Sequence, residues 1–203
     1  MNSTAHAPRR HTRRFVSFQL VVLLFAALAT TGFAPATITT STPGVIQIAA
    51  SYFHTCALLS SGGLMCWGYN SNGQLGDNTT ISHSTPVAVR GLTNLASAVA
   101  VGDRHSCALF KDGHISCWGA NNTGQVGDGT IIDKTTPVAV KGLAGPATMI
   151  GTGDNHTCAL LEDSSVECWG ANNVGQLGDG TIFVRQQCVM LVGLRHFLLL
   201  IHG

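Results

Sequence analysis

Six cysteines and three histidines recur at a fixed spacing, and they are the side chains with the most evident chemistry. Each histidine stands two residues before a cysteine, and a second cysteine follows ten residues after the first. The sets are His54, Cys56 and Cys66; His105, Cys107 and Cys117; and His156, Cys158 and Cys168. Imidazole and thiolate are zinc ligands, so each set offers three ligands to a metal ion. The same cysteines can instead form disulfides or, if reduced, act as small buried hydrophobic residues.

The three sets belong to a longer repeat with a step of 51 residues. The tripeptide Cys-Trp-Gly and a Gly-Gln pair keep this step in every copy. The tryptophans are Trp67, Trp118 and Trp169, and the glutamines are Gln74, Gln125 and Gln176. A period of this size indicates one supersecondary unit copied in tandem, as in solenoids and propellers.

The middle copy predicts four strands and no helix. Residues 105–110 and 114–119 flank Lys111-Asp112-Gly113, which is the pattern of a β-hairpin with a three-residue loop. The apolar run 98–101 precedes the hairpin, and residues 136–141 follow as a further strand with its proline at the start, where no ladder donor is lost. Four strands in a unit of roughly 40 to 50 residues match a propeller blade. The predicted fold class is therefore all-β, with three four-stranded propeller blades.

The hairpin turn determines which cysteines face each other. With the turn centred on Asp112, Cys107 and Cys117 form a directly opposed, non-hydrogen-bonded pair, with Cα atoms about 4.5 Å apart. That distance is near the short end of the disulfide range. The same count opposes Cys56 to Cys66 and Cys158 to Cys168. We expect one disulfide in each blade, with metal binding and reduced buried thiols as the alternatives.

The first 29 residues predict a secretory signal peptide. Four arginines precede an apolar run from Phe15 to Ala29, and Ala27-Leu28-Ala29 is a small-residue cleavage motif. The run is short for a spanning helix. Residues 30–44 are expected to be a linker. The mature protein is then secreted, periplasmic or on the cell surface, where disulfides persist. The alternative is a retained N-terminal membrane anchor.

Charge and motifs argue against several function classes. Without the signal peptide, the chain has seven basic and ten acidic side chains, a net charge near −3 with histidine neutral. No basic stripe is present, so nucleic acid is not an expected partner. Neither a G-x-S-x-G nucleophile elbow nor a G-x-x-x-x-G-K-[ST] phosphate loop occurs. The sequence predicts no enzyme activity and no cofactor, with an exported propeller-type lyase or hydrolase as an alternative.

The copies resemble a known repeat. The middle copy contains His105-Ser106-Cys107-Ala108-Leu109, then Cys117-Trp118-Gly119-Ala120-Asn121, then Gly124-Gln125-Val126-Gly127-Asp128, and the other two match it in register. These strings resemble the repeat of the regulator of chromosome condensation. The match covers residues 45–194, in copies of about 45–95, 96–146 and 147–194. The paired cysteines are similar to those of the exported bacterial branch. The resemblance implies a seven-bladed β-propeller, of which three repeats form a part.

The resemblance also implies structural roles for the repeated side chains. The family keeps its histidine without the cysteines, which favours a hydrogen bond within the blade for His54, His105 and His156. We expect the three tryptophans to pack blades together rather than to stack on a ligand. The Gly-Gln loops are expected to be turns between blades, with the glutamines bonded to neighbouring backbone. A calcium loop is the alternative, although each copy has one aspartate only.

The predicted function is an exported, non-enzymatic module that binds an unidentified protein or has a structural role, because loops on a rigid scaffold often bind partners. The third copy departs from the pattern. Cys188 replaces a proline and is the seventh, unpaired cysteine, either free or in an intermolecular disulfide. Residues 195–203 are an apolar tail that could begin a truncated fourth blade. A truncated gene remnant is therefore a second hypothesis. Uncovered blade faces predict self-association.

Overall fold

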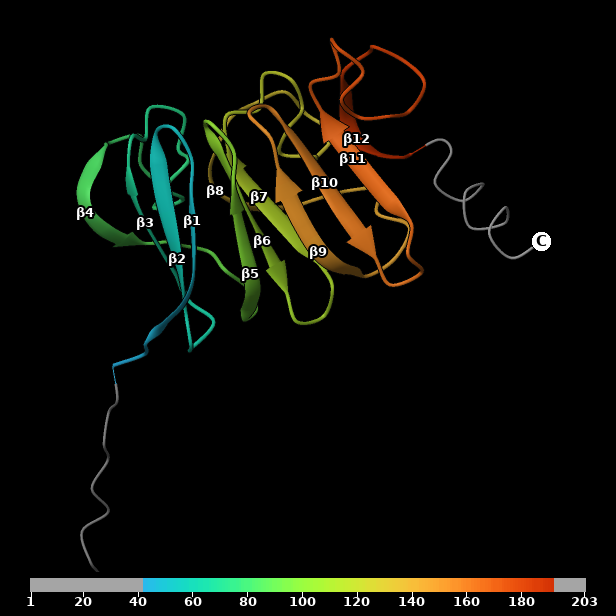
Figure 1. Cartoon of the computed structure of the whole chain (residues 1–203). Helices are drawn as coiled ribbons and strands as arrows, with labels where there is room; N and C mark the ends of the chain where they lie inside the picture. Colours follow the sequence, from blue (N-terminus) through green and yellow to red (C-terminus); the bar gives the residue numbers. More distant parts are fainter. Residues whose placement is uncertain (1–41, 192–203) are drawn as a thin grey trace, which may run out of the picture. The chain divides into compact units, whose positions relative to one another are not determined.

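Three four-stranded antiparallel sheets make up the part of the chain that the computed structural model describes, residues 42–191 (Figure 1). The predicted signal peptide, nearly all of the predicted linker and the apolar tail lie outside these residues. The first sheet contains β1 (Val45–Ala50), β2 (His54–Leu59), β3 (Leu64–Gly68) and β4 (His83–Ala88). The second contains β5 (Ala96–Val101), β6 (His105–Phe110), β7 (Ile115–Gly119) and β8 (Lys134–Ala139). The third contains β9 (Ala147–Thr152), β10 (His156–Leu161), β11 (Val166–Gly170) and β12 (Arg185–Met190).

Each sheet is a propeller blade in which the strands pair in chain order. The predicted fold class, all-β with three four-stranded blades, is confirmed. Between residues 42 and 191 there is no helix with the length and apolar character needed to cross a membrane.

The prediction for the outermost strand of the middle blade is wrong in its limits. β8 begins at Lys134, so Pro137 is its fourth residue rather than lying at its start. The strand tolerates this proline because β8 is at the edge of its sheet and bonds only to β7. An edge strand can leave one N–H position facing away from the ladder without losing a hydrogen bond.

The central hairpin of every blade has the predicted register. Cys107 lies opposite Cys117, and the equivalent pairs are Cys56 with Cys66 and Cys158 with Cys168. All three pairs are disulfides, with Cα atoms 4.1 Å apart. In the chain-entropy model, each short closed loop contributes about 3 kcal/mol to stability. Gly113 ends the middle turn at a φ of 80°, whereas the third blade uses Ser164 at 65° in the same place.

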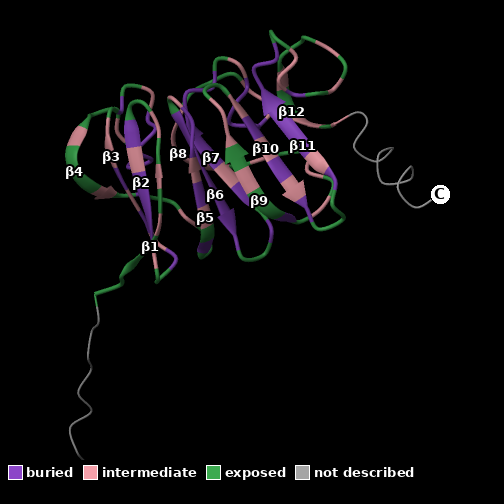
Figure 2. Ribbon diagram, in the orientation of Figure 1, coloured by how far each residue is buried: buried purple, intermediate pink, exposed green. Residues whose placement is uncertain are grey.

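The hydrophobic core lies between blades rather than within one. One cluster joins Leu58, Leu64 and Leu75 of the first blade to Val99 and Trp118 of the second. The corresponding cluster joins the second blade to the third. Figure 2 shows the consequence, because every residue of β6 is buried in the middle blade, which has a blade on either side. Each blade therefore needs a neighbour to cover its apolar face.

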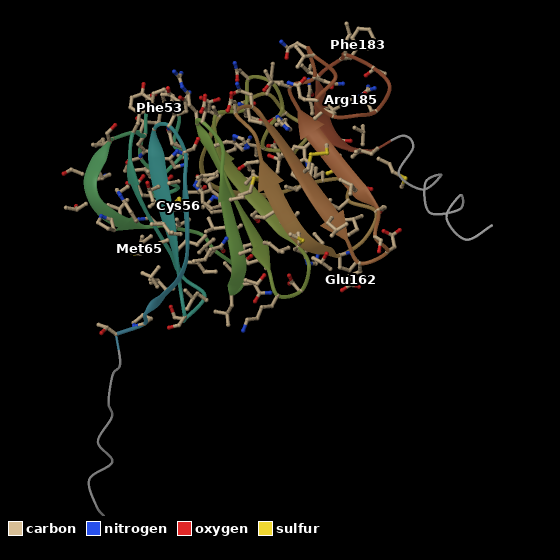
Figure 3. The ribbon with its side chains drawn as sticks, viewed as in Figure 1. Phe53, Cys56, Met65, Glu162, Phe183 and Arg185 are labelled. Carbon is tan, nitrogen blue, oxygen red and sulfur yellow. A yellow bond between two sulfur atoms is a disulfide. The ribbon has the colours of Figure 1, made fainter. Side chains whose placement is uncertain are left out.

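Two kinds of loop emerge at one end of every sheet. The connection from the first to the second strand and the long connection from the third to the fourth strand both lie there. We call this end the loop face, which comprises residues 51–53, 69–82, 102–104, 120–133, 153–155 and 171–184. The hairpin turns lie at the opposite end. In Figure 3 the labelled Phe53 and Phe183 lie at the loop face, and Glu162 lies at the turn end.

Candidate functional site

The repeated histidine, glutamine and tryptophan form one hydrogen-bond network across each blade junction. At the first junction, the Gln74 carbonyl accepts from the Ser106 hydroxyl and from the Trp118 indole N–H, both at 2.9 Å. The His54 Nε2 atom lies 2.7 Å from the Ser106 Oγ atom. The serine hydroxyl has one proton, which it gives to Gln74, so the neutral imidazole of His54 donates through Nε2.

The second junction repeats this network with the next set of residues. The Gln125 carbonyl accepts from the Thr157 hydroxyl at 3.1 Å and from the Trp169 indole N–H at 3.0 Å. His105 Nε2 lies 2.9 Å from Thr157 Oγ1. The histidine hydrogen bond therefore joins one blade to the next. The family resemblance had suggested a bond within a single blade.

The glutamine side chains close the loops that carry these carbonyls. The Gln74 Oε1 atom accepts from the backbone N–H of Asn72 at 3.0 Å, and Gln125 and Gln176 make the equivalent bond. Gln74 and Gln125 are completely buried, whereas Gln176 in the last blade is only partly buried. Trp67 is likewise partly buried, while Trp118 and Trp169 are completely buried. The repeated residues are therefore buried only where a neighbouring blade covers them.

Burial determines the ionisation of the junction histidines. It lowers the pKa of His54 to about 4 and that of His105 to about 3, and it also lowers the pKa of His156. Desolvation disfavours the charged imidazolium, so these rings are neutral near pH 7. His54 and His105 therefore hold the blades together as hydrogen-bonding groups rather than as cations.

The loop aspartates are occupied by neighbouring groups. The Asp128 carboxylate accepts from the Asn121 amide at 3.1 Å and from the Thr130 hydroxyl at 2.7 Å, and Lys134 lies 2.9 Å away. Asp77 and Asp179 have the same surroundings, with His83 and Arg185 in the place of the lysine. Within residues 42–191, no group of three His, Cys, Asp or Glu side chains is placed to hold a metal ion. The repeated cysteines, the loop aspartates, His54 and His105 therefore form disulfides and hydrogen bonds that stabilise the fold.

The residues that break the repeat are on the loop face. Three positions are aromatic in the first blade, namely Tyr52, Phe53 and Tyr69. The second blade has Asp103, Arg104 and Ala120 there, and the third has Asp154, Asn155 and Ala171. These positions precede the repeated histidine or follow the Cys-Trp-Gly motif, where the chain has left the sheet.

The aromatic residues and one arginine form a continuous exposed surface. The Phe53 ring centroid is 5.7 Å from that of Tyr52 and 5.7 Å from that of Tyr69. The Arg104 guanidinium lies 5.2 Å from the Phe53 ring centroid, over the ring, which is a cation–π geometry. Tyr52 is 89% exposed. We call Tyr52, Phe53, Tyr69 and Arg104 the aromatic patch.

A polar pocket of about 390 Å³ adjoins this patch. It shares Arg104 with the patch and spans loops of all three blades. Its lining is Asn72, Asp103, Arg104, Ala120, Asn122, Asp133 and Asn155. The loop face thus combines large apolar rings with a hollow that presents amide, carboxylate and guanidinium groups. This combination is typical of protein-binding surfaces, where aromatic residues and arginine supply most of the binding energy.

The sequence contained a signal for the patch that the repeat obscured. Attention to what the copies share selects the residues that build the fold. Attention to where they differ selects Tyr52, Phe53 and Tyr69, because large apolar rings in a loop are otherwise unexplained. The contact of Arg104 with Phe53 needs the second blade to pack on the first, so the sequence alone did not indicate it.

Comparison with known proteins agrees with the architecture. Two family models, each described as the regulator of chromosome condensation (RCC1) repeat, match the chain, one at residues 45–74, 96–125 and 150–176 and the other at 61–109 and 112–160. Among curated relatives, the probable E3 ubiquitin-protein ligase HERC3 of Homo sapiens is 37% identical over 66% of this chain and 13% of its own length. The ultraviolet-B receptor UVR8 of Arabidopsis thaliana is 36% identical over 70% of this chain and 33% of its own length.

Solved structures show the same fold. Human WBSCR16 superposes with a TM-score of 0.68 at 23% identity, covering 75% of this chain and 40% of that one. Yeast RCC1 (Prp20), in its complex with Kap60, superposes with a TM-score of 0.67 at 19% identity, covering 74% and 37%. This chain spans a third or less of the length of the curated relatives described above. The repeat matches and the three blades together place the chain in the family of regulator of chromosome condensation (RCC1) repeat proteins.

Proposed function

We propose that this chain is an exported, non-enzymatic module that binds another protein through the aromatic patch. The observation that carries the proposal is the exposed group of three aromatic rings with Arg104 over one of them. Tyr52 is almost completely exposed, so a partner that covers it would bury a large rigid ring. The adjoining polar pocket supplies hydrogen-bonding groups at the rim of such an interface.

The known uses of the fold support a protein partner. The yeast relative Prp20 has been solved bound to Kap60, and its binding to Gsp1p and histones has been studied. Those partners belong to that protein, and function is determined by sites rather than by folds. What carries over is that a protein with this fold can bind other proteins. The low charge of this chain suits an interface of rings and hydrogen bonds rather than electrostatic attraction.

A photo-reactive side chain at the patch tests the binding proposal. With Tyr52 replaced by a benzoylphenylalanine residue, irradiation of the producing cells should give one discrete cross-linked product. The same residue in place of Lys111, which is exposed on a hairpin turn at the opposite end of the blade, is the control. Once the partner is identified, Arg104→Ala and Phe53→Ala should each weaken binding at least about tenfold. Equal products from both positions, or no loss of affinity in either variant, would contradict the proposal.

Export makes a separate prediction that mass spectrometry can check. The protein recovered from outside the cytosol should begin at Thr30, after the Ala27-Leu28-Ala29 motif, and a non-reducing peptide map should contain the three disulfides. A chain that keeps residues 1–29 and has six thiols open to alkylation would contradict export. That result would leave the binding proposal to be decided by the cross-linking experiment.

A further inference from the structure

Each blade junction joins two different faces. The face toward the preceding blade provides a hydroxyl and an indole N–H, and we call it the donor face. The face toward the following blade provides a glutamine carbonyl and a histidine Nε2, and we call it the acceptor face. Both junctions within residues 42–191 have this arrangement with nearly the same distances. The interface is therefore directional, and a blade can meet its neighbour in one order only.

The donor face of the first blade has no neighbour among the described residues. It contains Ile48, Thr55 and Trp67. Ile48 is 63% exposed, whereas Val99, at the same position of the second blade, is 2% exposed because the first blade covers it. Thr55 and Trp67 are only partly buried, although Ser106 and Trp118 in the next blade are completely buried. The outer face of the first blade therefore has the hydrogen-bond donors of a junction, but no described blade supplies the acceptors.

Among the described residues, no neighbour covers the acceptor face of the third blade. Met149 is 62% exposed, whereas Gln47, at the same position of the first blade, bonds to the main chain of Val99 through both its amide atoms. A Cβ atom placed on Gly73 would meet the Cα atom of Thr135 at 2.6 Å, because the second blade presses on that loop. At Gly175, the third-blade equivalent, the nearest such atom is 3.9 Å away and belongs to the same loop.

We propose that these two faces bind each other between two copies of this chain, head to tail. The geometry of the internal junctions gives the contacts. Trp67 and Thr55 of one copy donate to the Gln176 carbonyl of the other, and His156 Nε2 bonds to the Thr55 hydroxyl. At the inner strands, Met149 packs against Ile48, just as Ala98 and Ile150 meet in one cluster at the second junction.

The chemistry of the two faces favours a second copy over an unrelated partner. Exposed Ile48 and Met149 are both large and apolar, and their positions face each other in the repeat. The two unused donors on one face suit the single unused carbonyl on the other, because one glutamine carbonyl accepts two such hydrogen bonds at each internal junction. Two copies would bring six of the described blades together, which lies within the range of about four to eight blades in propellers. We therefore expect a dimer joined through these two faces.

Charge substitutions at the two ends test this arrangement. Ile48→Lys damages only the donor face, and Met149→Glu damages only the acceptor face. Each variant alone should dimerise at least about tenfold more weakly than the unchanged protein, because each self-junction buries an unpaired charge. An equimolar mixture should dimerise again. In that mixture, the intact acceptor face of the Ile48→Lys chain meets the intact donor face of the Met149→Glu chain.

Light scattering across the micromolar range gives the masses, and Ile132→Lys is the control. Ile132 is 66% exposed in a loop of the middle blade, which has neither of the two uncovered faces, so this variant should dimerise normally. Unchanged unfolding curves would show that Ile48→Lys and Met149→Glu still fold. A monomeric unchanged protein, dimerisation that survives both single variants, or a mixture that stays monomeric would each overturn the proposal. An apolar interface between residues 192–203 of different copies would give the second of these results.

Discussion

Trp118→Ala should lower the free energy of unfolding by about 4 kcal/mol, which is the range for truncating a fully buried tryptophan. The indole is completely buried between two blades and donates to the Gln74 carbonyl at 2.9 Å. The indole also packs closely against Gly76, where a Cβ atom would lie 2.7 Å from the indole nitrogen, so its removal would leave a cavity in a tightly packed junction. Denaturant titration of the purified protein measures the change through its midpoint and slope.

Trp67→Ala is the matched control within the same chain. Trp67 has the same position in its blade as Trp118, and the equivalent disulfide lies beside it. No described blade covers its outer side. In protein dilute enough to be monomeric, this substitution should cost about 1 kcal/mol, in proportion to the smaller buried area. Equal losses for Trp67→Ala and Trp118→Ala would show that the tryptophan stabilises its own blade and not the junction.

Acidification from pH 7 to pH 5 should remove about 4 kcal/mol of stability. Burial lowers the pKa of His54 to about 4 and of His105 to about 3, whereas in the unfolded chain both have a pKa near 6.5. Between these values the unfolded chain binds more protons than the folded one. Stability therefore rises with pH through this window and falls as pH is lowered, by about 1.4 kcal/mol per pH unit for each histidine.

Variants separate the junction histidines from the other titrating groups. His54→Gln keeps a hydrogen-bond donor beside Ser106 but cannot ionise, so it should lower the slope of stability against pH between 6 and 4.5 by up to about 1.4 kcal/mol per pH unit, the contribution of one histidine. Ile132→Gln is the control, because Ile132 is an exposed side chain that does not ionise, so this variant should leave the slope unchanged. Asp128 titrates lower: burial alone would raise its pKa, but hydrogen bonds from Lys134 and Thr130 outweigh burial and lower it. A slope that His54→Gln leaves intact would contradict the assignment.

The sequence predicted the parts of this fold that depend on local pairing. The turn at Asp112 set the hairpin register, and the register placed Cys107 opposite Cys117. Both follow from the two-residue period of a strand, so no information about other blades was needed. The limits of β8 were missed because the edge position that tolerates Pro137 is a property of the assembled sheet.

The candidate site was beyond prediction for a related reason. Tyr52, Phe53 and Arg104 come from two copies of the repeat, and the cation–π contact arises only when the blades pack. The histidine bond was placed within the blade by analogy, whereas it crosses to Ser106 in the next blade. Contacts across a junction depend on the angle between one blade and the next. The spacing of residues within one repeat does not determine that angle.

The use of one side-chain set at every junction has a consequence for how such chains change over generations. A 51-residue segment duplicated in frame would present its own tryptophan to the preceding glutamine loop and its own glutamine loop to the following tryptophan. Neither new neighbour would need a compensating substitution, because Gln74 with Trp118 and Gln125 with Trp169 already make the same contact. Unequal recombination could therefore lengthen or shorten the array in single steps, while loop positions such as 52, 53 and 69 diverge freely in each copy.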